Sequence, residues 1–351
     1  MQRVPNSADW WTLPPGKTNT ICDVPDVKVG HFTNLNCTAR TGVSAILPHG
    51  GNLFDDPVQT GVAVLNGFGK SLGIVQVQEL GEIETPLLLT NTFSVPACAT
   101  ALIKKAILEN PTIGRGRRTV NPLVLECNDG RVNDIQAMAV TEAMAMQALQ
   151  DAANNRCKQG TVGAGTGMRT FGMAGGVGSA SRKLIISDQH QYTFGAFVLS
   201  NFGQESEFKL MGRQIPAHAQ SKGDEPDKGS IIIVFGTDAP LDSRQLSRVA
   251  RRASAALGKL GSYIGHQSGD IAIAFSNANR GKLGHSHGVQ QFERLDENEL
   301  NLVFHAAVES AEEAVINALW HSNSIEGYDG TRLPTLHERL GSLGLNWPKP
   351  I

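Results

Sequence analysis

The sequence lacks the features that mark several large classes of protein. No uninterrupted apolar run approaches the length needed to cross a membrane. Lys and Arg together number 31 against 33 Asp and Glu, so no basic surplus points to nucleic acid or an anionic membrane surface. We therefore expect neither a membrane nor a nucleic acid as partner, but a small molecule or a peptide.

Cysteine is scarce, with five in 351 residues. The five are Cys22, Cys37, Cys98, Cys127 and Cys157. Their spacing contains neither a CxxC pair nor the Cys/His pattern of a zinc site, and reduced thiols suit a cytoplasmic protein best. His285 and His287 in "GHSHG" have no obvious third ligand, so we expect polar surface there and predict neither a metal nor a cofactor.

A chain of 351 residues could form one large domain or two smaller ones, and we expect a single α/β domain over residues 1–351. With 40% hydrophobic residues the chain can bury a sizeable core without metal or disulfides. The first 19 residues hold three prolines and no continuous apolar segment, which predicts a loose leader and not a signal peptide. Residues 219–229 are the most linker-like segment, and residues 326–350 resemble an irregular surface tail.

Short segments rich in Val and Ile lie between turn signals and predict strands. They cover residues 27–32, 43–48, 72–80, 121–127, 183–187, 194–200, 230–236 and 270–276. The 38 glycines are the most unusual part of the composition. Because glycine is chosen where the backbone turns tightly or is approached closely, we expect many tight turns or a site lined by main chain.

Helical spacing of apolar residues predicts four helices. They cover residues 92–109, 133–152, about 243–260 and 297–319, the third capped by Asp242 or Ser243 and ended by Gly261. The carboxylates of "VESAEEA" near 308–314 are expected on the solvated face of the fourth helix. Helices in pairs between groups of strands argue for a layered α/β domain with mixed or antiparallel sheets.

Two glycine-rich stretches fail as nucleotide-binding motifs. Gly69, Lys70 and Ser71 match the end of a P-loop, but Val64 stands where that loop needs its first glycine. The stretch "GTVGAGTGM" at 160–168 ends in Met where the dinucleotide fingerprint needs glycine or alanine. We interpret both as turn-rich segments near a ligand.

The junction of Gly229 and Ser230 is unusual, because a polar loop changes there into a β-branched strand. A serine that caps a strand after a loop is common turn chemistry. The junction also suits self-cleavage, in which the Ser230 hydroxyl attacks the unhindered Gly229 carbonyl. Cleavage would give Ser230 a free α-amine, with a reference pKa of about 7.7–8.0, so that one residue supplies both nucleophile and base.

Several blocks of sequence carry a resemblance to a known family. They are "ICDVPDVKVGHFT", "GVSAILPHGGNLF", "VLNGFGKSLGIVQVQELGEIETPLLLTNT", "ECNDGRVNDI", "GTVGAGTGM", "SNFG", "KGSIIIVFGTDAPL" and "SGDIAIAFS". In this order, from about residue 20 to 340, the chain closely resembles the DmpA family, the L-aminopeptidase D-Ala-esterase/amidases that include the β-peptidyl aminopeptidases. The resemblance implies a four-layer αββα sandwich and self-cleavage into an α chain, 1–229, and a β chain, 230–351. It also implies homo-oligomers of αβ units.

The resemblance also implies catalytic residues. Ser230 matches the N-terminal serine nucleophile, and Asn201 in "SNFG" matches the asparagine of the oxyanion hole. Ser268 and Asp270 in "QSGD" match a serine and an acidic residue that hydrogen-bond around the nucleophile and its amine, and with a period of two both face one side of a strand. Several relatives have Glu where this chain has Asp270, so we expect the shorter side chain to contact the amine through water.

Two further residues match positions that bind substrate. Glu126 in "LECND" matches an acidic position associated with the free amino group of the substrate. Arg131 stands where relatives tend to have an aromatic or apolar residue, and its cation could repel the substrate ammonium or recruit a carboxylate. The resemblance thus implies an aminopeptidase or amidase that removes N-terminal amino acids from small peptides, amides or esters with a free amine.

Two alternatives remain open from the sequence. Ornithine acetyltransferases share the broad architecture and the self-processing, but they use threonine as the nucleophile. An unprocessed, non-enzymatic binding protein is the second alternative, in which Arg131 and Asp270 mark a site that has lost its activity.

Overall fold

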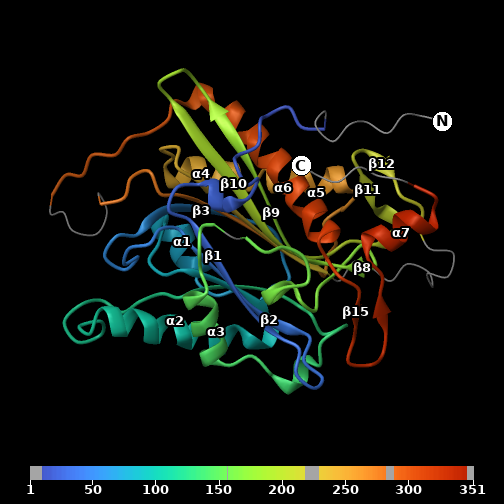
Figure 1. Cartoon of the computed structure of the whole chain (residues 1–351). Coiled ribbons are helices and arrows are strands. Elements are labelled where there is room, and N and C mark those ends of the chain that lie inside the picture. The colour runs from blue at the N-terminus through green and yellow to red at the C-terminus, as the bar shows by residue number, and fades with distance from the viewer. Residues whose placement is uncertain (1–9, 156, 218–228, 282–287, 346–351) are drawn as a thin grey trace.

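Two β-sheets lie face to face between two layers of helices (Figure 1). This computed structural model describes residues 10–155, 157–217, 229–281 and 288–345. The four-stranded sheet has the order β1 (Lys28–Asn34), β2 (Thr41–Leu47), β5 (Leu87–Asn91), β6 (Leu123–Cys127). The six-stranded sheet has the order β4 (Glu82–Ile83), β3 (Val58–Gly67), β14 (Gly269–Ser276), β13 (Ser230–Thr237), β10 (Gln191–Asn201), β9 (Gly176–Ile185).

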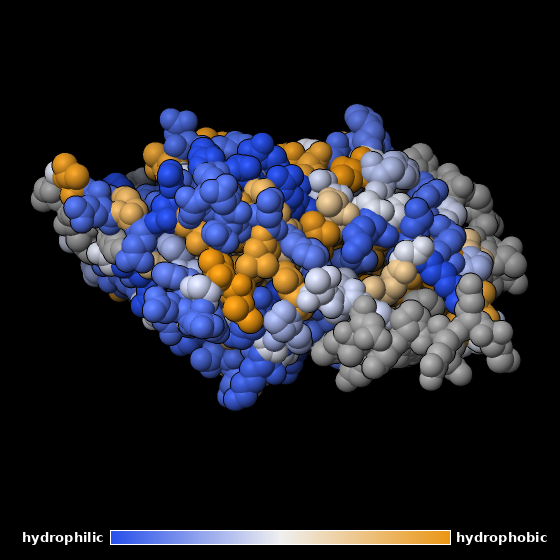
Figure 2. Space-filling view, turned by 90° about the horizontal axis from the view of Figure 1, so that it is seen from above, coloured by the Kyte–Doolittle hydropathy of each residue, from blue (hydrophilic) through white to orange (hydrophobic). Residues whose placement is uncertain are grey.

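Helices cover the outer face of each sheet. The four-stranded sheet packs against α2 (Val95–Glu109) and α3 (Glu142–Gln150). The six-stranded sheet packs against α4 (Ser243–Ala250) and α6 (Leu300–Trp320), with α5 (Ala253–Leu260) beside α6. The predicted αββα sandwich is therefore confirmed. Seen from above this second helical layer, the surface is mostly hydrophilic, with a small group of hydrophobic side chains near its centre (Figure 2).

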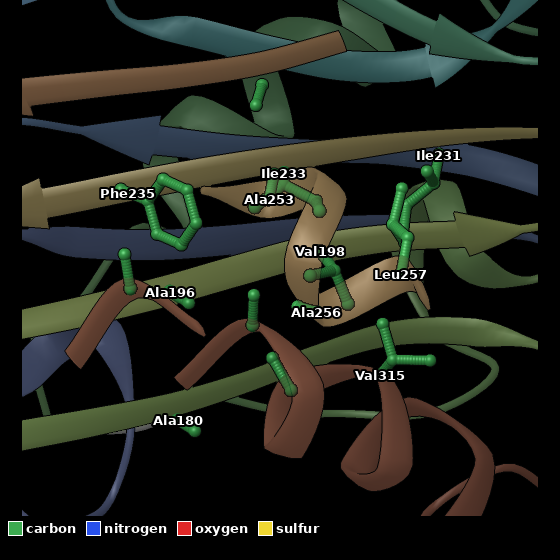
Figure 3. Packing of buried hydrophobic residues seen from close by; sticks show 14 of the residues in the cluster. Ala180, Ala196, Val198, Ile231, Ile233, Phe235, Ala253, Ala256, Leu257 and Val315 are labelled. Atoms are coloured by element: carbon green, nitrogen blue, oxygen red, sulfur yellow. The ribbon is translucent and has the colours of Figure 1, made fainter. Parts of the chain in front are cut away.

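Each interface between layers holds its own hydrophobic cluster. Strand β13 contributes to two of them, because its side chains alternate between its faces. Ile231, Ile233 and Phe235 face the helices and meet α5 and α6 (Figure 3). Ile232 and Val234 face the other sheet. A strand buried on both faces in this way has the continuous apolar sequence that the "SIIIVFG" segment shows.

The strand predictions hold except at one segment. Strands β1, β2, β6, β9, β10, β13 and β14 overlap the predicted ones. The prediction for residues 72–80 is wrong, because this segment forms α1 (Ile74–Leu80). Gly73 and Gly81 at its two ends have positive φ values of 96° and 69°. Only Val77 is buried, so the short apolar run contains a surface helix. Strands β3 and β5 were not predicted.

The helix predictions hold with shifted boundaries. The third predicted helix is divided into α4 and α5, with Asp242 accepting a hydrogen bond from Gln245 N at 2.7 Å at its start and Gly261 ending it. The second predicted helix begins only at Glu142, where α3 starts after its N-cap residue Thr141. The predicted irregular tail contains α7 (Leu336–Ser342), whose Leu336 is buried.

Three two-stranded pairings and several 3₁₀ turns complete the described elements. The pairings are β7 (Arg169–Thr170) with β8 (Met173–Ala174), β11 (Lys209–Leu210) with β12 (Arg213–Gln214), and β15 (Ile325–Glu326) with β16 (Arg332–Leu333). The linker-like residues 219–228 and the first nine residues lie outside the described part of the chain.

The carboxylates of α6 are not solvated, so their predicted exposure is wrong. Glu309, Glu312 and Glu313 are 4%, 1% and 0% exposed. Arg182 of β9 is fully buried beneath α6 and pairs with Glu309 at 2.9 Å and Glu313 at 2.6 Å, while Lys259 pairs with Glu312. A buried carboxylate needs such a partner, and the sequence could not show that β9 would supply an arginine here.

Gly178 lets α6 lie directly on β9, and this contact generates a prediction. A Cβ added at Gly178 would stand 1.9 Å from the Ala314 carbonyl oxygen, a main-chain atom that cannot move alone. Gly178→Ala should lower the free energy of unfolding by about 3 kcal/mol. Gly258→Ala is the control, because its Cβ meets nothing within 4 Å, and it should raise stability by about 0.5–1 kcal/mol. Urea unfolding measures both, and equal effects would contradict the close contact.

Candidate active site

Ser230 is the first residue of β13, and its side chain is directed between the two sheets. It has the same parity as Ile232 and Val234, which face the four-stranded sheet. Ser230 is 6% exposed, and its Oγ has no hydrogen-bond partner among the described residues. A buried hydroxyl without a partner is unfavourable for stability, which is the situation expected of a group kept for chemistry.

The sheet brings two neighbouring strands to the start of β13. The parallel pairing with β14 puts Gly269 opposite Ser230, and the antiparallel pairing with β10 puts Asn201 there on the other side. The Gly229 carbonyl oxygen accepts a hydrogen bond from Gly269 N at 3.2 Å. The carbonyl next to Ser230 is therefore held in the sheet and polarised by a main-chain donor.

The side chain of Asn201 is oriented as a donor. Its Oδ1 accepts a hydrogen bond from Arg169 N, and its Nδ2 donates to the Asn128 carbonyl oxygen, both at 2.9 Å. These two bonds fix which end of the amide carries the hydrogens. The second hydrogen on Nδ2 is not used in either bond, so Asn201 can donate to a ligand oxygen beside Ser230.

Ser268 and Asp270 form a buried pair at the start of β14. The Ser268 hydroxyl donates to Asp270 Oδ1 at 2.6 Å, which places both side chains on one face as the alternation predicts. The same oxygen accepts a hydrogen bond from Ile231 N at 3.2 Å. By alternation along β14 this face is turned to the helices, away from the Ser230 hydroxyl. The pair therefore acts on the main chain of β13.

Glu126 comes from the other sheet, near the end of β6, and is 3% exposed. Its Oε1 accepts a hydrogen bond from Lys70 N at 2.7 Å, and its Oε2 accepts one from the Thr92 hydroxyl. A Cβ added at Gly69 would lie 3.5 Å from Glu126 Oε1 and 3.8 Å from Gly269 Cα. Gly69 thus stands between the carboxylate and the residue that pairs with Ser230.

The segment 66–73, whose glycines resemble a P-loop, forms the wall on this side. Phe68 N donates to the Ser268 carbonyl oxygen at 3.3 Å, and Asn66 Nδ2 donates to the same oxygen. The part from 68 to 73 turns between β3 and α1, and a ligand beside it stays a prediction. No local pattern predicted that its main chain would hold Glu126.

Cys127 was not predicted as a site residue, yet its thiol lies beside Ser230. Burial raises the pKa of Cys127 well above its ordinary value, the charges of Glu126 and Asp270 add to the rise, and the adjacent Ser230 side chain opposes it. The thiol donates to the Leu199 carbonyl oxygen at 3.5 Å. Cys127 is thus a neutral packing partner of Ser230. Only its place after Glu126 in the "ECND" block could have suggested this position.

Arg131 lies on the loop after β6 and is exposed. Together with Arg169, Arg332 and Arg339 it lines a cavity of about 940 Å³. The lining of this cavity includes neither Ser230 nor Glu126. The structure thus gathers Asn201 and the Ser268–Asp270 pair around the start of β13 and places the Glu126 carboxylate on the other side of Gly69. It places Arg131 on a cavity whose lining includes none of these residues. His285 and His287 lie outside the described residues.

Comparisons with known proteins identify the family to which the chain is similar. The model of peptidase family S58 matches residues 19–333. The "Beta-peptidyl aminopeptidase BapA" of Sphingosinicella microcystinivorans is 34% identical over 94% of this chain and 88% of its own length. A β-aminopeptidase from a Burkholderia species has 34% identity and a TM-score of 0.86, covering 97% of this chain and 100% of that one.

A second solved structure is that of the L-aminopeptidase D-Ala-esterase/amidase of Ochrobactrum anthropi. It is 34% identical, covers 97% of both chains and has a TM-score of 0.87. It is described as a prototype for the serine aminopeptidases and as a variant of the Ntn hydrolase fold.

Asp129, next to the residue that holds Asn201, generates a prediction about pH. Burial raises its pKa to about 6 from 3.8, while hydrogen bonds from Thr41, Asn133 and Asn91 lower it. The folded state therefore binds more protons than the unfolded state between about pH 4 and 6. The stability that protonation gives is complete below about pH 4 and is lost as the pH rises through about 6.

Asp129→Asn removes this titration. Relative to this variant, the parent protein should lose on the order of 2 kcal/mol of unfolding free energy between pH 4 and 7. Urea unfolding of both proteins across this range provides the measurement. Parallel pH profiles would show that Asp129 does not titrate in this way.

Proposed function

Because the chain belongs to peptidase family S58 and is an aminopeptidase with the N-terminal-nucleophile hydrolase fold, we propose that it cuts itself between Gly229 and Ser230 and then uses Ser230 as its nucleophile. The resemblance to the DmpA family is confirmed, and a peptidase family favours hydrolysis over the acyltransferase alternative and over a non-enzymatic binding protein. The observation that carries the proposal is the buried Ser230 hydroxyl, without a described hydrogen-bond partner, beside a Gly229 carbonyl held by Gly269 N.

Self-cleavage begins when Ser230 Oγ attacks the Gly229 carbonyl carbon. The hydrogen bond from Gly269 N stabilises the negative charge that develops on the carbonyl oxygen. The C–N bond then breaks, the acyl group passes from nitrogen to oxygen, and water hydrolyses the resulting ester. The products are a carboxylate at Gly229 and a Ser230 with a free hydroxyl and a free α-amine.

Turnover uses the same atoms in new roles. The substrate ammonium binds at Glu126, and the Ser230 α-amine, with a reference pKa of about 7.7–8.0, takes the proton from Oγ as it attacks the substrate carbonyl. Asn201 Nδ2 donates to the oxyanion. Ser268 and Asp270 hold the start of β13 through Ile231 N, and water releases the acyl group.

The substrates are small peptides, amides or esters with an unblocked amine, without metal or cofactor in the reaction. The relatives are named β-peptidyl aminopeptidases and a β-aminopeptidase, so peptides that begin with a β-amino acid are the first substrates to test. Arg131 lines its cavity together with Arg169, whose N–H holds Asn201, and its charge is proposed to affect the range of substrates from there.

We also propose that the αβ units assemble into homo-oligomers in the cytoplasm. The family resemblance supports the assembly, and five free cysteines suit a reducing compartment. Within the described residues, no helix is long and apolar enough to cross a membrane.

The first test follows processing. Purified protein should run as two bands, and the smaller one should begin with Ser230. Ser230→Ala should leave one inactive band, because no hydroxyl remains to attack Gly229. Ser254→Ala, which removes an exposed serine from α5, is the control and should be processed and active. An uncut parent protein with full activity, or a Ser230→Ala variant that is still cut, would rule out this mechanism.

The second test concerns the amine site. Glu126→Gln should lower kcat/KM on β-alanyl p-nitroanilide by roughly 10–100-fold, mainly by raising KM, while self-cleavage proceeds. Thr92→Val should have a weaker effect in the same direction, since it loses the hydroxyl that donates to Glu126, and Thr92→Ser should restore the parent values. Unchanged KM values in processed Glu126→Gln would exclude the carboxylate as the amine site.

A further inference from the structure

Two of the cysteines, Cys22 and Cys157, lie together outside the group of residues around Ser230. Cys22 belongs to the 3₁₀ turn Ile21–Asp23, and Cys157 lies in the segment between α3 and β9. Both are partly exposed, both pack against the hydrophobic cluster between the two sheets, and each thiol is close enough to shift the pKa of the other. Although 135 positions apart in the sequence (22 to 157), they form one dithiol.

The segments that carry the two thiols are both attached to Ser179 of β9. Ile21 N donates to Ser179 Oγ at 2.7 Å, and Ser179 N donates to Gln159 Oε1 at 2.7 Å. Cys22 Sγ also donates to the Ala153 carbonyl oxygen at 3.8 Å. These contacts hold both segments against β9 and bring the two thiols to the same place on the sheet.

The two thiols differ in a way that suits disulfide exchange. The hydrogen bond from Cys157 lowers the pKa of Cys22. The same hydrogen bond, together with burial, raises the pKa of Cys157 well above its ordinary value. Because the thiolate is the attacking species, Cys22 is the thiol that reacts first, and Cys157 is placed to attack the product.

We propose that Cys22 and Cys157 are a redox modification site and form a reversible disulfide with a disulfide oxidant such as oxidised glutathione. The Cys22 thiolate attacks the oxidant, forms a mixed disulfide and releases one glutathione. The Cys157 thiolate then attacks Cys22 Sγ and releases the second. The protein loses two electrons and two protons, and the oxidant gains them. The bond joins the 3₁₀ turn Ile21–Asp23 to the segment that follows α3, independently of the aminopeptidase chemistry.

The experiment uses the full chain with Cys37→Ser, which removes an exposed competing thiol. Cys98 and Cys127 are buried and their pKa values are raised, so they are expected to stay reduced. After treatment with oxidised glutathione, the intact mass should fall by two hydrogen atoms, and non-reducing peptide mapping should link the Cys22 and Cys157 peptides. The melting temperature should rise by roughly 5 °C and return on reduction, because the bond closes a long loop.

Cys157→Ser and Cys157→Ala, made in the same background, should instead keep a glutathione on Cys22. A stable adduct on Cys22 in the parent, with Cys157 still reduced, would overturn the proposal. So would a parent that reacts at neither thiol. Two variants at Cys157 are used so that a folding defect in one of them does not remove the control.

Discussion

The parallel pairing of β13 with β14 is the constraint on which the site depends. It lies in the middle of the six-stranded sheet and fixes Ser230 opposite Gly269 and Ile231 opposite Asp270. The antiparallel neighbour β10 then fixes Asn201. Residues far apart in the sequence are thus held by ladder hydrogen bonds on a rigid element, which is how a reactive group is kept in position. Glu126 of the second sheet reaches this region through the loop of Gly69 and Lys70, whose main chain holds its carboxylate.

The sequence predicted the elements well where one rule decided the outcome. A continuous β-branched run predicted β13, the alternation in "DIAIAFS" predicted β14, and apolar spacing predicted α2 and α6. It failed at residues 72–80, where two glycines with positive φ end a short helix. It failed also for Glu309, because its partner Arg182 lies 127 positions away and no local pattern reports such a pairing.

The site was predicted by resemblance more than by pattern. The local sequence could show only that Gly229 and Ser230 were suitably placed for self-cleavage. The blocks that match the family added the other candidate site residues, Asn201, Ser268, Asp270 and Glu126. Neighbours that act through the main chain or through packing carry no such signal. Two such neighbours are known only from the structure. They are the Lys70 amide that holds Glu126 and the Cys127 thiol beside Ser230.

The place of β13 and β14 in the sheet also bears on how a cut protein would persist. Both strands belong to residues 230–351, yet they lie between β3 and β10, which belong to residues 1–229. Separating two such chains would require breaking ladders on both sides of the pair. Once apart, they could return only by a bimolecular encounter, so recovery would depend on protein concentration. The lifetime of a cut enzyme with this topology would be set by the rate of its unfolding and not by an equilibrium between folded and unfolded chains.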